Sequence, residues 1–285
     1  MIIIVFLGRS LTDLIGKYEE KPFPKIQNSV GDIFEFSRSK YYVLGLVEAD
    51  VTLAQETIGL HKAKTGESLS FTAWIAKCLA QTISEFPEAN SYRKGRSRVI
   101  TFKDVDVVIV VEKKVGDTKY PVPYVIRNVN EEKFTEIHAE IRNAQAGTFS
   151  DEQKAIDEEK KRDSQSFFMR VVNPYSLPRF VRMIYWRGFR TDPFKVKRVM
   201  GTAGITSVGM FGRGGGWPIS VGTHTVDLAV GGIARKPGVV GDEIAIRQYL
   251  QFSIYFDHEI IDGAPAARFT SRLVELMESA FALTV

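Results

Sequence analysis

The sequence contains little cysteine and little histidine, which limits the chemistry it can support. Its one cysteine, Cys78, excludes an internal disulfide framework, and the helix-spaced apolar residues around it predict that it lies in the core. Four scattered histidines and one cysteine form no metal-ligand spacing, so we expect no metal site. A chain without disulfides fits the cytoplasm, which is the localisation we expect.

The sequence also lacks a long hydrophobic run. The apolar stretch 1–7 is too short to span a bilayer, and Gly8 and Arg9 interrupt it. It has neither the basic flank nor the small-residue cleavage site of a signal peptide. We therefore expect a strand or an anchoring arm here rather than a targeting segment.

Neither sign of charge dominates. The 38 Lys and Arg residues exceed the 34 Asp and Glu residues by a formal charge of only +4, too small an excess to favour nucleic-acid binding. With 44% hydrophobic and 25% charged residues, the composition is typical of a soluble globular protein. No internal repeat or low-complexity linker divides the 285 residues. We expect a single domain, 1–285.

The most informative stretch surrounds His258. Apolar residues at alternate positions over 244–256 predict a strand with one buried face. After it, apolar residues at three- and four-residue steps predict an amphipathic helix. His258 lies in the turn between them and shares the parity of the buried face. A rigid, partly dehydrated imidazole there meets the needs of a general base, although the pattern alone favours a core histidine satisfied by the backbone.

Asp262 and Gly263, which follow His258 along the chain, are expected to have structural roles. Asp262 stands where it can cap the following helix, and Gly263 would allow the tight turn before it. Of the other histidines, His224 is interpreted as a loop residue, although it could line the same channel as His258. His61 and His138 fall on predicted helices and are interpreted as structural.

Elsewhere, hydrophobic periodicity predicts both strands and helices. The strands are expected at 40–49, 98–103, 105–112, 217–221 and 225–232, and the helices at 52–64, 74–86 and 131–146. The glycine-rich segment Gly209–Gly216 lacks the lysine and helix start of a phosphate-binding loop, and its glycines do not follow dinucleotide-binding spacing. We expect a sharp connection between strands there.

The segment 150–198 differs from its surroundings because it is first polar and then basic and aromatic. Three interpretations are open. It could form a solvated amphipathic helix, contact a protein partner or neighbouring subunit through Phe180, Trp186 and Phe189, or bind anions such as coenzyme A phosphates, a membrane or nucleic acid. We rank a partner within 167–198 above a membrane, and a membrane above nucleic acid.

Four stretches fall into one order along the chain. They are FPEAN at 86–90, PVPYVIRN at 121–128, GITSVGMFG at 204–212 and DHEIIDGAPAARF at 257–269. In this order they resemble motifs of the catalytic domain of the dihydrolipoyl acyltransferases of 2-oxoacid dehydrogenase complexes, a fold shared with chloramphenicol acetyltransferase. The resemblance covers about 35–148 and 200–283, which makes 150–198 an insertion.

The resemblance implies an α/β (α+β) fold in which helices flank a mixed central sheet, and acyl transfer between a dihydrolipoyl thiol and coenzyme A, a substrate here. His258 would be the general base. The hydroxyl that stabilises the oxyanion would come from Thr206, aligned on the glycine turn after it, or from Ser207 next door. Asp262 would order the active-site loop through an arginine, for which Arg38 and Arg9 are candidates.

The resemblance also implies a homotrimer, and a larger assembly of such trimers, with the active site between subunits. His258 would come from one subunit and Thr206 from its neighbour. The residues before 35 are too few for the lipoyl and subunit-binding domains that precede this core in the family, so we expect no covalently bound lipoyl group. Acyl-coenzyme A or a lipoyl-carrying protein would then act in trans. The alternative function is a catalytically reduced trimeric scaffold of a dehydrogenase-like assembly.

Overall fold

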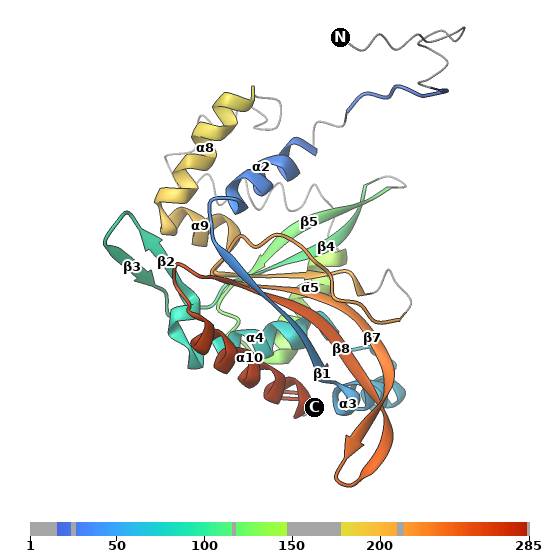
Figure 1. Ribbon diagram of the computed structural model, residues 1–285. Coiled ribbons are helices and arrows are strands. Elements are labelled where there is room, and N and C mark those ends of the chain that lie inside the picture. The colour runs from blue at the N-terminus through green and yellow to red at the C-terminus, as the bar shows by residue number, and fades with distance from the viewer. Residues whose placement is uncertain (1–15, 24–26, 116–117, 147–177, 210–213, 284–285) are drawn as a thin grey trace, which may run out of the picture.

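A six-stranded mixed sheet forms the centre of the molecule (Figure 1). The computed structural model describes residues 16–23, 27–115, 118–146, 178–209 and 214–283. In spatial order the sheet contains β1 (Tyr42–Asp50), β8 (Glu243–Asp257), β7 (Val226–Val240), β6 (Ala203–Ser207), β4 (Val107–Val115) and β5 (Thr118–Ile126). Strand β6 pairs in parallel with β4 and β7, and the other neighbours are antiparallel. The predicted mixed sheet is confirmed.

Helices cover both faces of this sheet. They are α2 (Gln27–Ser37), α3 (Thr52–Thr65), α4 (Phe71–Glu85), α5 (Phe134–Ala146), α8 (Arg179–Thr191), α9 (Pro193–Met200) and α10 (Gly263–Glu278). The 3-10 turn η1 (Pro87–Asn90) leads from α4 into a separate hairpin of β2 (Ser91–Lys94) and β3 (Arg98–Thr101). Figure 1 shows α4, α5 and α10 together below the sheet and α2, α8 and α9 grouped above it.

Helix α4 forms the centre of the main core. The Ser70 hydroxyl accepts a hydrogen bond from the Ala73 backbone N–H and caps the helix start, and Pro87 follows its last residues. Trp74 is fully buried in a cluster that includes Phe252 of β8 and Phe269 of α10. Since a buried aromatic side chain contributes several kcal/mol, this cluster joins the helical layer to the sheet.

An ion pair on the surface ties α4 to α10. Arg272 donates from Nε and Nη2 to the two carboxylate oxygens of Glu85, at 2.7 and 3.2 Å. These hydrogen bonds are the main reason why the pKa of Glu85 lies below its usual value of 4.5. A carboxylate whose pKa is lowered by folding stabilises the protein above its unfolded pKa, and the contribution disappears as pH falls through the folded value.

The variant Arg272→Gln is therefore expected to be slightly less stable than the wild type at pH 7, because it loses the charged hydrogen bonds to Glu85 and the one to Glu275. The difference should shrink as the pH falls below 4.5, the usual pKa of the carboxylate, and through the lowered pKa of Glu85 in the folded protein. Urea denaturation of both proteins at a series of pH values measures it. A difference that stays constant down to pH 3 would show that packing of the arginine, and not its charge, stabilises this contact.

Some predicted elements are wrong. No strand forms at 217–221, because these residues cross the sheet surface and are held by side-chain contacts instead: the Trp217 indole donates to the Val47 carbonyl oxygen at 3.0 Å, and Ser220 N–H donates to the Tyr255 hydroxyl at 2.6 Å. The strand expected at 98–103 does form, as β3, but it belongs to the separate hairpin. Helix α2 was not predicted.

The predicted one-sided burial of β8 is also wrong. Ile244 and Ile246 are 80% and 67% exposed, whereas residues 250–257 are buried at both parities. The reason is that β1 ends at Asp50, opposite Tyr249, so β7 and β8 continue beyond it as a two-stranded ribbon. Further along, β8 has a strand on each side and is covered on both faces.

The segment predicted to be an insertion contributes α8 and α9, which pack against α2. A second apolar cluster joins Phe36 of α2 to Phe189 of α8 and Val196 of α9. Phe189 is buried and the Trp186 ring lies 5.6 Å from that of Phe36. Phe189 is therefore not available for the predicted partner contact, whereas Trp186 is only half-buried, so a contact through Trp186 and Phe180 stays a prediction. Phe180 remains 69% exposed.

Candidate active site

The turn that carries His258 is fixed by contacts to the segment before β1. The His258 backbone N–H donates to the Tyr41 carbonyl oxygen at 2.7 Å. The buried Asp257 carboxylate accepts a bond from Lys40 Nζ at 2.6 Å and another from the Glu259 backbone N–H at 3.2 Å. These contacts hold the backbone on both sides of His258, so the imidazole is placed by a rigid turn.

The His258 side chain itself is 44% exposed. Its Nδ1 lies 3.9 Å from Asp262 Oδ1, which is beyond hydrogen-bond range, and the Asp262 side chain is itself 84% exposed. Asp262 occupies the N-cap position of α10 as predicted, but its side chain makes no capping hydrogen bond. The predicted cap is wrong in this respect, and the carboxylate is left facing the imidazole.

Two further expectations about this turn are corrected. Gly263 has no positive φ, and a Cβ added to it would meet nothing within 4 Å, so the turn does not need a glycine for its conformation. Arg38 contacts Glu35 at 3.4 Å, and no contact joins it to Asp262 among the described residues. The other candidate, Arg9, lies outside those residues. The ordering ion pair is instead the one between Lys40 and Asp257.

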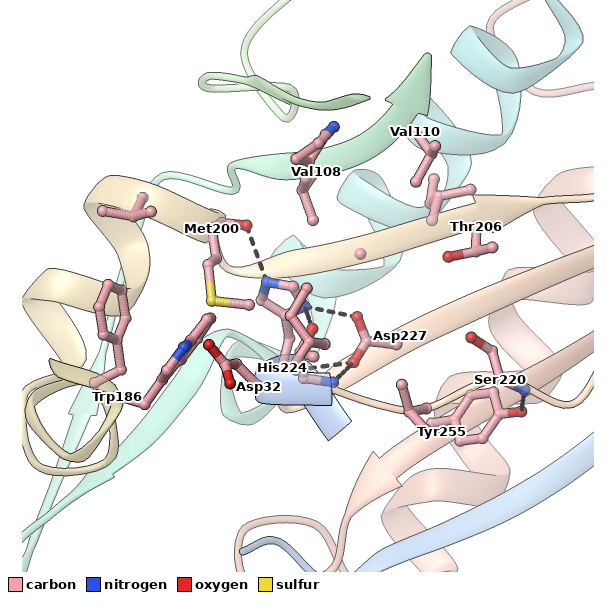
Figure 2. A pocket seen from close by; sticks show the side chains of 18 of the residues that line it. Asp32, Val108, Val110, Trp186, Met200, Thr206, Ser220, His224, Asp227 and Tyr255 are labelled. Atoms are coloured by element: carbon pink, nitrogen blue, oxygen red, sulfur yellow. Dashed lines mark hydrogen bonds and ion pairs between the residues drawn. The ribbon is translucent and has the colours of Figure 1, made fainter. Parts of the chain in front are cut away.

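Thr206 lies on the opposite side of the sheet from the main core, in a pocket of about 510 Å³ (Figure 2). The pocket lies between the sheet and the helices α8 and α9, and Thr206 lines it from β6. Within the described part of the chain, the Thr206 hydroxyl has no hydrogen-bond partner. Ser207 is not among the lining residues.

A single chain does not bring Thr206 and His258 together. Thr206 pairs with Ala229, which pairs with Ser253, and His258 follows Ser253 by five residues along and beyond β8. At the rise of a strand this is a separation of about 17 Å along the sheet, before the two intervening strand spacings are added. Direct cooperation of the two side chains would require a second copy of the chain.

The pocket also holds a buried histidine–aspartate pair that sequence reasoning missed (Figure 2). His224 lies in the loop before β7, as predicted, but is fully buried. Its Nδ1 lies 2.6 Å from Asp227 Oδ1 and its Nε2 lies 2.9 Å from the Met200 carbonyl oxygen. Asp227 also accepts the backbone N–H groups of Thr223 and His224.

Because both ring nitrogens of His224 are engaged, it has no nitrogen free to act on a substrate. The pair instead joins β7 to the end of α9. The sequence feature that could have indicated this pair is the three-residue spacing of His224 and Asp227, together with Gly204, which lies beside them on β6. A Cβ at Gly204 would collide with Asp227 Oδ1 and approach the His224 ring, which explains a glycine inside a buried strand.

Replacing Gly204 by alanine is therefore expected to destabilise the protein by about 1–3 kcal/mol, because the added methyl group overpacks the site. The matched control is Gly59→Ala in α3, where the Cβ meets nothing within 4 Å and a higher helix propensity should leave stability equal or slightly raised. Thermal unfolding measures both. If the two variants had equal melting temperatures, the close approach at Gly204 would not be a constraint.

The remaining candidates are structural. His138 accepts a bond from Ser70 N–H at Nδ1 and contacts Glu67 at Nε2, which lowers the pKa of Glu67. Burial raises the pKa of the Cys78 thiol, so it is no nucleophile at neutral pH. Over the described ranges, no group of three His, Cys, Asp or Glu side chains could hold a metal ion. No helix in those ranges is both long and apolar enough to cross a membrane.

A family model for the 2-oxoacid dehydrogenases acyltransferase (catalytic domain) matches residues 17–159 and 196–285. The chain belongs to this acyltransferase family. The resemblance predicted from the four motifs is confirmed. Residues 160–195 lie between the two matched ranges. Helix α8 therefore falls outside the family pattern, whereas α9 begins just before the second matched range and ends within it.

Among curated relatives, the acyltransferase-family chain is 28% identical over 232 residues to the "dihydrolipoyllysine-residue acetyltransferase component of pyruvate dehydrogenase complex" of Acholeplasma laidlawii, covering 81% of this chain and 34% of the relative. It is 26% identical over 219 residues to the corresponding succinyltransferase component of the 2-oxoglutarate dehydrogenase complex of Staphylococcus epidermidis, covering 76% and 41%. The chain thus spans about a third to two fifths of these relatives.

Solved structures of the family share the fold. A probable dihydrolipoamide acetyltransferase of Listeria monocytogenes has a TM-score of 0.64 at 21% identity, covering 95% of this chain and 98% of that one. The cubic core of a pyruvate dehydrogenase multienzyme complex has a TM-score of 0.67 at 21% identity, with coverage of 99% and 100%. A dihydrolipoamide acetyltransferase of Azotobacter vinelandii has a TM-score of 0.66 at 20% identity, with the same coverage, and was studied for a serine, a histidine and an asparagine in its catalytic mechanism.

Proposed function

We propose that the chain is a coenzyme A-dependent acyltransferase in which His258 is the general base and the Thr206 hydroxyl stabilises the oxyanion. The observation that carries the proposal is the Thr206 hydroxyl, which lines a pocket without a hydrogen-bond partner among the described residues. An unpaired hydroxyl at an apolar wall is a donor available to a developing negative charge. Family membership supplies the reaction class.

Spacing supports the choice of residues. In the Azotobacter vinelandii acetyltransferase the histidine follows the serine by 52 positions, and the asparagine follows the histidine by four. In this chain His258 follows Thr206 by 52 positions, and Asp262 follows His258 by four. Ser207 is out of step by one position and does not line the pocket. Thr206 is therefore the favoured oxyanion donor.

The proposed reaction needs one proton transfer in each direction. A thiol with a pKa near 8.5 is mostly protonated at neutral pH. The neutral imidazole of His258 takes its proton as the sulfur attacks the carbonyl carbon of an acyl thioester. The Thr206 hydroxyl donates a hydrogen bond to the oxyanion of the tetrahedral intermediate. Collapse of the intermediate breaks the original carbon–sulfur bond, and the departing thiolate takes the proton back from the imidazolium.

Asp262 would assist His258 electrostatically. When the imidazole becomes positively charged, a carboxylate a few ångströms from Nδ1 stabilises it. The Azotobacter vinelandii enzyme has an asparagine four positions after its histidine, so this chain replaces an amide with a charge. We assign Asp262 a positioning role and no proton transfer.

The site would be completed by a neighbouring copy in a homotrimer, because one chain separates the two residues. The surface of β1 supports such a contact. This strand lies at the edge of the sheet, and Val43, Leu44 and Leu46 are 38%, 42% and 55% exposed. Exposed apolar residues on a sheet edge favour burial by another chain. Growth of trimers into a larger assembly is part of the same proposal.

The experiment is an acyl transfer assay. The purified chain is incubated with an acyl-coenzyme A and free dihydrolipoamide or a lipoyl-carrying protein, and free coenzyme A and S-acyl product are separated by chromatography. Enzyme-dependent formation of both products in equal amounts is expected. A trimer that gives no transfer with any donor would contradict the proposal and favour the alternative scaffold function.

A further inference from the structure

The walls of the Thr206 pocket are mostly apolar. The sheet contributes Val108 and Val110, α8 contributes Val181 and Trp186, and α9 contributes Val199 and Met200. Figure 2 shows Thr206 and Trp186 on opposite sides of the pocket, so the proposed oxyanion donor lies across from the wall formed by α8. At about 510 Å³ it is within the range of small-molecule sites, about 300–1,000 Å³.

The charged groups of the pocket neutralise one another. Arg182 of α8 donates from Nε and Nη2 to Asp32 of α2 at 2.7 and 3.2 Å, and both side chains are largely buried. Asp227 is held by His224 and two backbone N–H groups. A ligand with a charged tail would therefore have to break an existing pair or be buried without a partner, and both are costly.

The wall formed by α8 is outside the family pattern, since residues 160–195 lie between the matched ranges. This helix is held by the ion pair to Asp32 and by the packing of Trp186 and Phe189 against Phe36. The pocket therefore combines a strand inside the matched ranges, which provides Thr206, with a wall that lies outside them. Such a wall is where a difference in substrate choice between members would arise.

We propose that this pocket binds the acyl chain of the substrate, and that this chain is apolar, uncharged at its far end and longer than an acetyl group. The proposal rests on the acyl transfer proposed above. The thioester carbonyl lies at Thr206 and the hydrocarbon chain extends toward Trp186. Acetyl leaves most of the pocket unfilled, and succinyl places a carboxylate against walls whose cation is already paired.

The test compares donors of increasing chain length in the transfer assay. From acetyl- to octanoyl-coenzyme A, kcat/KM is expected to rise by roughly three- to fourfold for each buried methylene group, and so by at least about 100-fold over the series. Succinyl-coenzyme A should be no better than acetyl-coenzyme A. A preference for acetyl or succinyl donors would overturn the proposal while leaving acyl transfer itself intact.

A variant tests whether the acyl chain binds in this pocket. Val199 lines the pocket and is 54% exposed, so Val199→Trp can extend a ring into the cavity without entering the main core. The ratio of octanoyl to acetyl kcat/KM should fall at least tenfold. The matched control is Val239→Trp at the tip of the β7–β8 ribbon, where the side chain is 77% exposed and away from the pocket, and the ratio should be unchanged. Equal ratios in the two variants would contradict the assignment.

Binding without turnover separates this proposal from the proposed reaction. Octanoyl-pantetheine and acetyl-pantetheine are titrated against the protein by calorimetry and by tryptophan fluorescence, with Trp186→Phe to identify the responding ring. Tight binding of the octanoyl compound that Val199→Trp weakens supports the pocket. Binding of this kind with no transfer from any donor would overturn the acyl assignment together with the proposed function. Transfer with no dependence on chain length would overturn the pocket alone.

Discussion

The Thr206→Val variant is expected to lose about 10²–10³ in kcat for acyl transfer, equivalent to about 2.7–4 kcal/mol of transition-state stabilisation. Valine has the shape of threonine but no hydroxyl, so the pocket stays filled while the oxyanion loses its donor. The KM for the acyl donor should change little, because the hydrogen bond strengthens only as charge develops. Steady-state kinetics at saturating donor and acceptor measure both values.

Two companion variants make this result specific. Thr206→Ser keeps a hydroxyl and should retain most of the activity, with some loss because serine is less restricted at χ1 than threonine. Ser207→Ala removes the neighbouring hydroxyl, which does not line the pocket, and should stay within about twofold of the wild type. Were Ser207→Ala the more damaging variant, the assignment of the oxyanion donor would move to Ser207.

His258→Ala is expected to lower kcat by about 10²–10⁴, the usual contribution of a positioned general base. The loss should be largest near neutral pH and smaller at alkaline pH, where the attacking thiol is already ionised and needs no base. The matched control is His61→Ala on α3, a histidine far from the turn in sequence and with no assigned role. Rates over a series of pH values, with each protein checked for unchanged unfolding temperature, measure the effect.

Mixing the two inactive variants tests whether the site lies between subunits. If each site uses His258 of one copy and Thr206 of the next, trimers assembled from equal amounts of His258→Ala and Thr206→Val chains contain intact sites. Random assembly should restore about a quarter of the wild-type activity, because one in four neighbouring pairs has both residues in the required order. Co-expression with two affinity tags isolates the mixed trimers, each of which has one intact pairing in three, so the purified mixed trimers should have about a third of the wild-type activity. No recovery in such trimers would show that the two residues do not form a shared site.

The region around His258 was the most predictable part of the chain. The alternation over 244–256 and the three- and four-residue steps after 263 correspond to β8 and α10, and they place His258 in the turn between the two. Side-chain period is a local property of a strand or a helix, so a single sequence is enough to read it. The same periodicity does not show which part of β8 is buried, because that depends on where the neighbouring strand β1 ends.

The ordering contacts of the site were not predictable to the same extent. Asp262 stood out because it follows a histidine at a recognisable spacing, but the buried ion pair belongs to Asp257 and Lys40, which are separated by 217 positions. Arg38 was a reasonable candidate by charge and position and contacts Glu35 instead. Charge along a sequence identifies groups that need partners, and the fold alone selects the partner.

Periodicity and motifs predicted the strand and the helix that hold His258, the mixed sheet flanked by helices, and the candidate hydroxyls Thr206 and Ser207. The folded chain was needed to show that Thr206 lines a pocket, that His224 is engaged at both ring nitrogens, and that Trp186 and Phe189 of α8 pack onto Phe36 of α2. Most of these contacts join residues that lie far apart along the chain. Arg182 meets Asp32 across 150 positions, and no periodicity or propensity, which act over a few residues, reports a contact of that range.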